Sequence, residues 1–249
     1  MSAIALVGGS FLGAWAWERV TPALADAGHE VHPLTLTGFG DRAHLGSAET
    51  DLTTHVTDIV AALEVADLRE VVLVAHSYAG VPATIAASRI PGRVARLVYV
   101  AALLPEPRKT LFEMAPPGFE EIIGHLVATE GDGWRIPVMS DEILDANFGE
   151  HDLSPDDRAW LRARGVGHPV ATYRERVPDD LGAVDALPRT YIACEGDPGD
   201  PPIAPGTPGW QAATIATGHW PMITAPLELA RLIDEAARTP APSRELAGS

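Results

Sequence analysis

The chain has 249 residues, of which 46% are hydrophobic and 21% are charged, and its 34 acidic and 18 basic side chains give a formal net charge of −16. This length suits one large α/β domain, or such a domain with an inserted cap, and the composition is that of a globular protein. An acidic surface of this kind repels phosphate backbones and anionic lipids, so we expect neither a nucleic-acid partner nor a membrane partner.

The cysteine content and the amino-terminal segment limit the kinds of site and the cell compartment that we expect. Cys194 is the only cysteine, which excludes an intrachain disulfide and a thiolate cluster that would hold zinc. The segment MSAIALVGGS has no basic region and only a short apolar run, unlike a signal peptide, and no apolar run elsewhere has the length of a membrane span. We therefore expect a cytoplasmic protein.

Short apolar runs alternate with helix-permissive segments through the first hundred residues. Such runs are typical of parallel strands that are covered on both faces, and the alternation predicts a doubly wound, mostly parallel sheet. The predicted strands cover residues 3–7, 31–36, 71–75 and 94–100, and the predicted helices cover residues 15–27, 51–66 and the segment after Ser77 up to about Ile90.

The alternation stops between Leu104 and about Leu187, where repeated prolines leave room only for short helices, such as 119–129 and 141–148. We interpret residues 104–187 as a lid inserted over the carboxyl edge of the sheet. The lid supplies candidates for an apolar substrate pocket, although each of them could instead pack within the lid. These candidates are Phe112, Met114, Phe119, Trp134, Ile136 and Phe148.

The α/β alternation resumes after Pro188. It predicts a strand over 190–194, a short strand near 212–216 and a final helix over about 226–237. Residues 1–103 and 188–238 therefore form the predicted core, and residues 239–249 are expected to be a flexible tail.

The stretch VVLVAHSYAGVPATIAA, from Val71 to Ala87, places Ser77 between a predicted strand and a predicted helix. A serine at such a turn is lifted above the sheet edge, beside the first free N–H groups of the helix, which suits a nucleophile. The turn needs small side chains two positions on either side, and Ala75 and Ala79 stand where glycines are usual. The alternative is an ordinary turn in which Ser77 caps the helix.

Three side chains suited to acyl transfer follow predicted strands, whose carboxyl ends meet at one edge of a parallel sheet. They are Ser77, an acid after the strand over 190–194, and His219. A serine hydroxyl needs a neutral imidazole to take its proton and a carboxylate to orient that imidazole. Asp197 is the first candidate for the acid, with Asp200 and Glu195 as alternatives.

The oxyanion that forms during acyl transfer also needs fixed hydrogen-bond donors. The N–H of Tyr78 is one expected donor, because this residue directly follows the nucleophile. We expect the second donor from the glycine-rich loop after the first strand, with the N–H of Ser10 as first candidate and that of Phe11 as second.

Over nearly its whole length the chain resembles the α/β-hydrolase superfamily, and within it the branch of plant methyl esterases, hydroxynitrile lyases and bacterial pyrethroid-hydrolase-like esterases. The resemblance lies in LVGGSFLGAWAWERVTPALADAGHEV, DIVAALEVADLREVVLVAHSYAG, LVYVAALLPE and ATGHWPMITAPLELA, among other segments. It implies a serine hydrolase without metal or organic cofactor, and Asp197 matches the position of the family's acid best.

The chain departs from the family pattern at several positions. Gly8 stands where family members usually have a histidine, and Ala101 stands where close relatives often have an aspartate, which favours the acids after residue 194. Trp220 follows His219, where hydroxynitrile lyases of this branch have a lysine, so hydrolysis is preferred to a lyase reaction. We also count Trp220 among the candidate substrate-binding residues.

We therefore expect a carboxylesterase or lactonase that cleaves a small, largely apolar ester through an acyl-enzyme. Two alternatives stay open. One is a lyase or cyclase that acts on a polyketide-like intermediate and tolerates the loss of Ser77, and the other is a small-molecule receptor. The sequence does not identify the ester, and it does not choose between a monomer and a homodimer.

Overall fold

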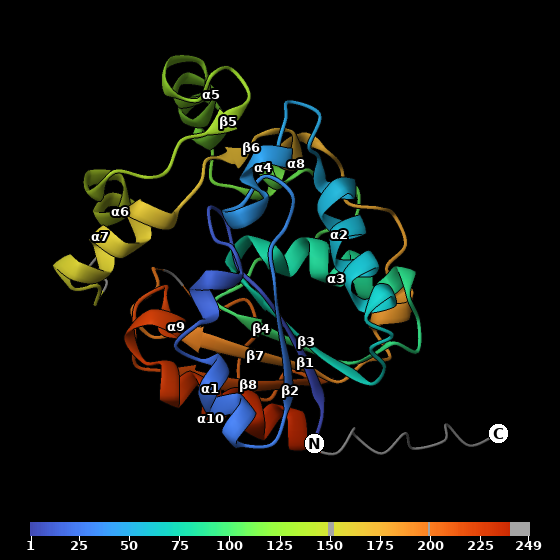
Figure 1. The fold of residues 1–249 in the computed structure, drawn as a ribbon. Coiled ribbons are helices and arrows are strands. Elements are labelled where there is room, and N and C mark those ends of the chain that lie inside the picture. The colour runs from blue at the N-terminus through green and yellow to red at the C-terminus, as the bar shows by residue number, and fades with distance from the viewer. Residues whose placement is uncertain (149–151, 199, 240–249) are drawn as a thin grey trace.

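A six-stranded sheet forms the centre of the computed structural model, which describes residues 1–148, 152–198 and 200–239. Neighbouring strands pair in parallel in the order β2-β1-β3-β4-β7-β8 (Figure 1). This order confirms the predicted doubly wound parallel sheet. The strands are β1 (Ala3–Val7), β2 (Glu30–Leu34), β3 (Val71–His76), β4 (Val94–Val100), β7 (Arg189–Cys194) and β8 (Trp210–Ile215).

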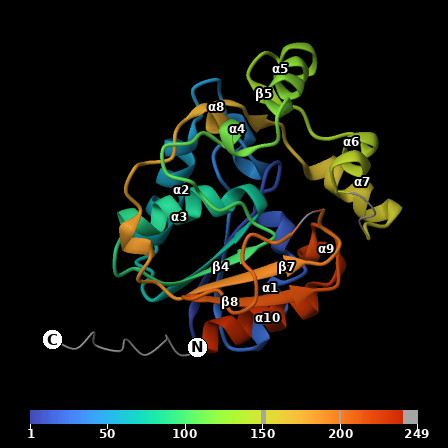
Figure 2. The ribbon, with the colours of Figure 1, turned by 180° about the vertical axis from the view of Figure 1, so that it is seen from behind.

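Helices cover both faces of this sheet, with α2 and α3 on one face and α1 and α10 on the other (Figures 1 and 2). The helices of this body are α1 (Thr21–Asp26), α2 (Leu52–Val65), α3 (Gly80–Arg89), α9 (Pro221–Thr224) and α10 (Pro226–Arg238). Short 3-10 turns span Ala14–Trp17, Gly40–Leu45, Ser77–Ala79 and Gly182–Val184.

Strand β3 lies inside the sheet and is buried along its whole length. Successive side chains of a strand point to opposite faces. Leu73 and Ala75 accordingly pack in the cluster that includes α2 and α3, whereas Val72 and Val74 pack in the cluster that includes α1 and α10. Burial on both faces explains why this strand is a continuous apolar run in the sequence.

The helix predicted over residues 15–27 is wrong as a single element. The structure has a 3-10 turn at Ala14–Trp17 and then α1 at Thr21–Asp26. Pro22 lies in the first turn of α1, where its missing N–H is tolerated, but the same proline would interrupt a helix that began at Trp15. The prediction over 51–66 is confirmed by α2, which Asp51 caps by accepting a hydrogen bond from the Thr54 N–H at 2.8 Å.

Residues 104–187 contain the short elements that the prolines predict. Figures 1 and 2 show α5, α6 and α7 grouped beside the body formed by the sheet and its covering helices. The antiparallel pair β5·β6 joins the two arms of the segment. The elements are α4 (Leu111–Met114), α5 (Phe119–Glu130), β5 (Arg135–Ile136), α6 (Asp141–Phe148), α7 (Pro155–Arg164), β6 (His168–Pro169) and α8 (Ala171–Arg174).

Helix α7 is an element that the sequence reasoning missed, although its start carries a signal. Ser154 and Asp157 form a capping box, and Pro155 occupies the first position of the helix. None of the described helices combines the length and the hydropathy that crossing a bilayer requires. The predicted flexible tail lies outside the described residues, except for Thr239.

Candidate active site

Ser77 lies at the sharp turn between β3 and α3. Its backbone φ is +53°, a left-handed conformation that residues other than glycine rarely adopt. The segment after β4 stabilises this turn, because the Leu103 N–H donates a hydrogen bond to the Ser77 carbonyl at 3.0 Å. A Cβ at Gly80 would lie 2.1 Å from the Leu103 carbonyl oxygen, so only glycine allows the start of α3 to pack this closely.

The structure brings Ser77, His219 and Asp197 together in one chain of hydrogen bonds. Ser77 Oγ lies 2.9 Å from His219 Nε2, and His219 Nδ1 lies 2.9 and 3.0 Å from the two carboxylate oxygens of Asp197. A carboxylate accepts the Nδ1 proton, which leaves Nε2 as an acceptor for the serine proton. Among the described residues, neither Glu195 nor Asp200 hydrogen bonds to His219, so Asp197 is the acid that meets the imidazole.

The imidazole of His219 is fixed by apolar and polar contacts. Its ring packs against Phe148, with ring centroids 4.5 Å apart, and edge-to-face against Trp220 at 5.1 Å. The neighbouring His76 Nε2–H donates to the His219 carbonyl oxygen at 2.8 Å. Burial lowers the pKa of His76 well below its ordinary value, so this second imidazole stays neutral and braces the backbone of the first.

The candidate oxyanion donors lie around Ser77. A Cβ at Gly9 would stand 2.7 Å from the Cβ of Ser77, so only glycine allows the loop after β1 to come this close. Throughout the described residues, the backbone N–H groups of Ser10 and Phe11 have no hydrogen-bond acceptor. The N–H of Tyr78 likewise lies at a helix start, where no intrahelical acceptor exists.

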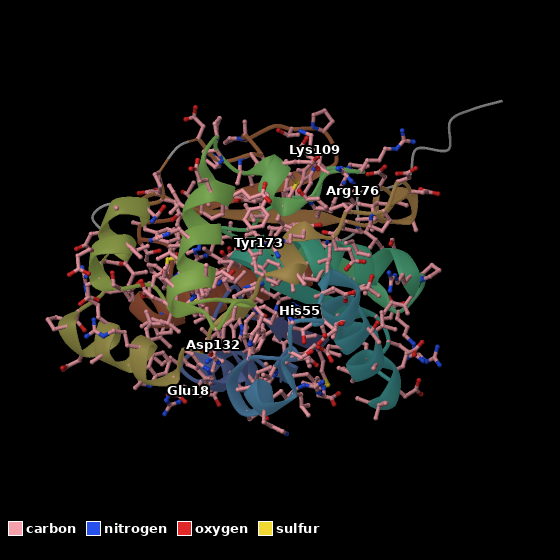
Figure 3. All side chains as sticks on the ribbon, turned by 90° about the horizontal axis from the view of Figure 1, so that it is seen from above. Glu18, His55, Lys109, Asp132, Tyr173 and Arg176 are labelled. Carbon is pink, nitrogen blue, oxygen red and sulfur yellow. The ribbon has the colours of Figure 1, made fainter. Side chains whose placement is uncertain are left out.

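A buried polar network next to Ser77 and Tyr78 was not predicted from the sequence. The His55 Nε2–H donates to the Thr37 carbonyl at 2.8 Å, so His55 Nδ1 accepts the hydroxyl proton of Tyr78 at 2.9 Å. The Tyr78 ring also meets His168 edge-to-face at 4.5 Å and stacks on Tyr173 at 5.9 Å. Figure 3 shows His55 and Tyr173 in the middle of the molecule as seen from above.

We expect this network to make stability depend on pH. Burial lowers the pKa of His55 from 6.5 to about 4. The unfolded chain therefore binds a proton that the folded chain excludes between these values, and stability falls on acidification through this window by up to about 1.4 kcal/mol per pH unit for one such imidazole. The measurement is the free energy of urea unfolding across this range, compared with a His55→Gln variant. An equally steep slope in the variant would contradict the assignment.

A cavity of about 600 Å³ opens beside Ser77 and His219, and most of its wall is apolar. Of the predicted pocket residues, the wall includes Phe119, Ile136, Phe148 and Trp220, together with Ser10, Phe11 and Tyr78. The sequence reasoning missed several lining residues of α5 and the segment after it, although the apolar helical spacing along α5 could have indicated the first three. They are Ile122, Ile123, Leu126, Val138, Met139 and Ile143.

Three predicted pocket residues do not line the cavity. Phe112 is buried within the 104–187 segment, where its ring contacts Tyr173 at 5.3 Å. Met114 packs against the core on the α2 and α3 side, and its sulfur accepts the Glu106 N–H. Trp134 lies beneath the Arg135 guanidinium, 5.4 Å from the ring centroid. None of the three therefore contributes to the cavity wall beside Ser77.

The structure also bears on thiol chemistry and on metal binding among the residues that it describes. Burial raises the pKa of the Cys194 thiol to about 12, so it stays protonated at neutral pH. Within the described ranges, no group of three or more His, Cys, Asp or Glu side chains is arranged to hold a metal ion.

Comparison with known proteins gives a family match at residues 4–232, to the alpha/beta hydrolase family. A carbendazim hydrolyzing esterase from Nocardioides sp. (strain SG-4G) is 32% identical over 242 aligned positions, and the match covers 92% of this chain and 97% of that protein. Methylesterase 10 of Arabidopsis thaliana is 26% identical over 258 aligned positions, and the match covers 93% of this chain and 90% of that protein.

Solved structures show the same fold. An extracellular alpha/beta-hydrolase from a Paenibacillus species superposes with a TM-score of 0.82 at 19% identity, over 96% of this chain and all of that chain (100%). Because the family model covers most of the sequence and a full-length relative exceeds 30% identity, the chain belongs to the alpha/beta hydrolase family.

Proposed function

We propose that the chain is a carboxylic ester hydrolase in which Ser77 is the nucleophile, His219 is the general base and acid, and Asp197 orients His219. The observation that carries this proposal is the unbroken hydrogen-bonded chain from Ser77 Oγ through the imidazole to the Asp197 carboxylate. The two relatives that align over nearly their whole length support the proposal, because both are named as esterases.

The proposed reaction runs through an acyl-enzyme. Ser77 Oγ attacks the ester carbonyl carbon while His219 Nε2 takes the hydroxyl proton, and Asp197 stabilises the resulting imidazolium. The N–H groups of Tyr78 and Ser10, with Phe11 as the alternative to Ser10, stabilise the oxyanion of the tetrahedral intermediate. His219 then gives its proton to the departing alcohol.

A water molecule completes the cycle. His219 takes a proton from this water, whose oxygen attacks the acyl carbon, and the second tetrahedral intermediate collapses to release the carboxylic acid. The proton returns from His219 to Ser77 Oγ, so the enzyme ends as it began.

The cavity suggests the kind of ester. Its wall is mostly apolar, and α5 and α6 of the 104–187 segment supply much of it, together with the connection between them. Such a wall favours a neutral, largely apolar substrate, because an uncompensated charge would lose its hydration there. We therefore propose that residues 104–187 act as a lid that determines which esters fit beside Ser77.

A fluorophosphonate probe tests the proposal. We expect rapid covalent labelling at Ser77, located by mass spectrometry of the digested protein, and turnover of 4-nitrophenyl esters whose rate varies with acyl length. Lactones assayed beside these esters would separate an esterase from a lactonase. A folded protein that neither reacts with the probe nor hydrolyses any of these substrates would contradict the proposed function.

A further inference from the structure

Two hydroxyl groups face each other in the wall of the cavity beside Ser77. Ser10 Oγ, in the loop after β1, lies 3.2 Å from the hydroxyl oxygen of Tyr173, in helix α8, and both residues line the cavity. A second hydrogen bond joins the loop after β1 to the 104–187 segment, since the Val166 N–H donates to the Phe11 carbonyl at 3.1 Å. The Tyr173 ring is also stacked on Tyr78, so the hydroxyl pair is held in place from both sides.

One of the two hydroxyl protons of this pair has no acceptor within the pair. Two hydroxyl groups carry two protons, and their mutual hydrogen bond uses one of them, whichever oxygen donates. No other hydrogen-bond partner of Ser10 Oγ or of the Tyr173 hydroxyl occurs among the described residues. The nearby hydroxyl of Tyr78 hydrogen bonds to His55 Nδ1 and to neither member of the pair.

The position of the hydroxyl pair indicates which part of a bound substrate could accept this proton. Gly9, which precedes Ser10, is so close to Ser77 that a Cβ on it would stand 2.7 Å from the serine Cβ. The pair that includes the next residue, Ser10, therefore lies near the ester group that Ser77 attacks, whichever of its two oxygens carries the free proton. When a ligand displaces water from this largely apolar cavity, an O–H without an acceptor is unfavourable, whereas a ligand acceptor restores the hydrogen bond.

We propose that the Ser10–Tyr173 hydroxyl pair is a substrate-binding subsite, which donates a hydrogen bond to an oxygen or nitrogen acceptor a few bonds from the scissile carbonyl. The substrates are then esters that carry such a heteroatom close to the ester group, rather than plain hydrocarbon esters. This inference rests on the proposed function, and it adds a polar requirement to a cavity that is otherwise apolar.

Two isosteric pairs of substrates test the subsite on both sides of the ester. On the acyl side, 4-nitrophenyl methoxyacetate is compared with 4-nitrophenyl butanoate, and on the alcohol side a 2-methoxyethyl ester is compared with the butyl ester of the same acid. In each pair an ether oxygen replaces one methylene. The ratio of kcat/KM within a pair is measured for the wild type and for the variants, so that intrinsic reactivity cancels.

The double variant Ser10→Ala/Tyr173→Phe removes both hydroxyls and keeps the Ser10 N–H and the Tyr173 ring. We expect it to lower the ether-to-methylene ratio by about tenfold in at least one substrate pair, the discrimination that one lost hydrogen bond supplies. Each single variant retains one hydroxyl, whose proton is then free, so its ratio is expected to lie between those of the wild type and the double variant. If the double variant fails to fold, Ser10→Gly/Tyr173→Phe, which removes the same two hydroxyls and keeps the N–H at position 10, takes its place.

Tyr99→Phe is the matched control. The Tyr99 hydroxyl also pairs with another hydroxyl, that of Thr84 at 2.8 Å, but this pair lies in the buried core and outside the cavity. Its loss is expected to lower the melting temperature and to leave both ratios unchanged. A double variant with wild-type ratios that still hydrolyses the butanoate ester would overturn the subsite and leave the esterase intact. If the wild-type protein showed neither probe labelling nor turnover, both the subsite and the proposed esterase function would be contradicted.

Discussion

Ester hydrolysis by a Ser77→Ala variant is expected to fall by about 10⁵-fold or more in kcat, because the acyl-enzyme can no longer form and only binding and the oxyanion donors remain. The fold should be retained, since alanine removes a single oxygen whose hydrogen-bond partner is His219 Nε2. The measurement is steady-state turnover of a 4-nitrophenyl ester with protein free of wild-type enzyme, together with loss of fluorophosphonate labelling.

Ser88→Ala is the matched control for this change. Ser88 lies near the end of the same helix, α3, and its hydroxyl donates to the Ile85 carbonyl at 2.7 Å, away from the cavity. Its turnover is expected to equal that of the wild type. Substantial hydrolysis by the folded Ser77→Ala variant would instead support a mechanism in which His219 activates water directly.

Asp197→Asn is expected to lower kcat by about 10⁴-fold, which is the loss typical of this substitution in a serine triad. Asparagine nearly matches the shape of the carboxylate, but its neutral amide neither fixes the proton on His219 Nδ1 nor stabilises the imidazolium. Asp197 meets this nitrogen with both oxygens, at 2.9 and 3.0 Å. Steady-state kinetics at several pH values would measure the loss.

Two neighbouring acids supply the controls for Asp197. Asp200→Asn and Glu195→Gln make the same neutralising change on the same loop, at side chains that have no hydrogen bond to His219 among the described residues. Both variants are expected to keep kcat close to that of the wild type. A large loss at either position, with little effect of Asp197→Asn, would transfer the orienting role to that acid.

Local patterns were sufficient to predict the sheet and the position of Ser77 at the turn between a strand and a helix. Runs such as Val71–His76 are apolar because both faces of the strand are buried, and this requirement is visible without a structure. The small residues around Ser77 likewise reflect the tight turn itself. The prediction of a single helix over 15–27 was wrong. The position at which a helix containing Pro22 starts depends on how the preceding turn packs.

The cavity wall was predicted only in part. Phe119 and Phe148 line it, whereas Phe112 and Trp134 belong to the same segment and do not. Hydrophobicity indicates that a side chain is buried, but it does not indicate against what. In a segment of short helices, the face that each helix turns toward Ser77 is set by its neighbours, such as the β5·β6 pair.

The sequence by itself determined the parallel α/β fold, the strand–turn–helix that carries Ser77, and the order of serine, acid and histidine, because these depend on local patterns and on the rule that loops after parallel strands share one edge. Only the tertiary structure decided that Asp197 meets His219 and that Tyr173 meets Ser10 across 163 residues. Contacts of this kind depend on how a loop and a distant segment pack against the sheet, and that packing leaves no periodic signal in the chain.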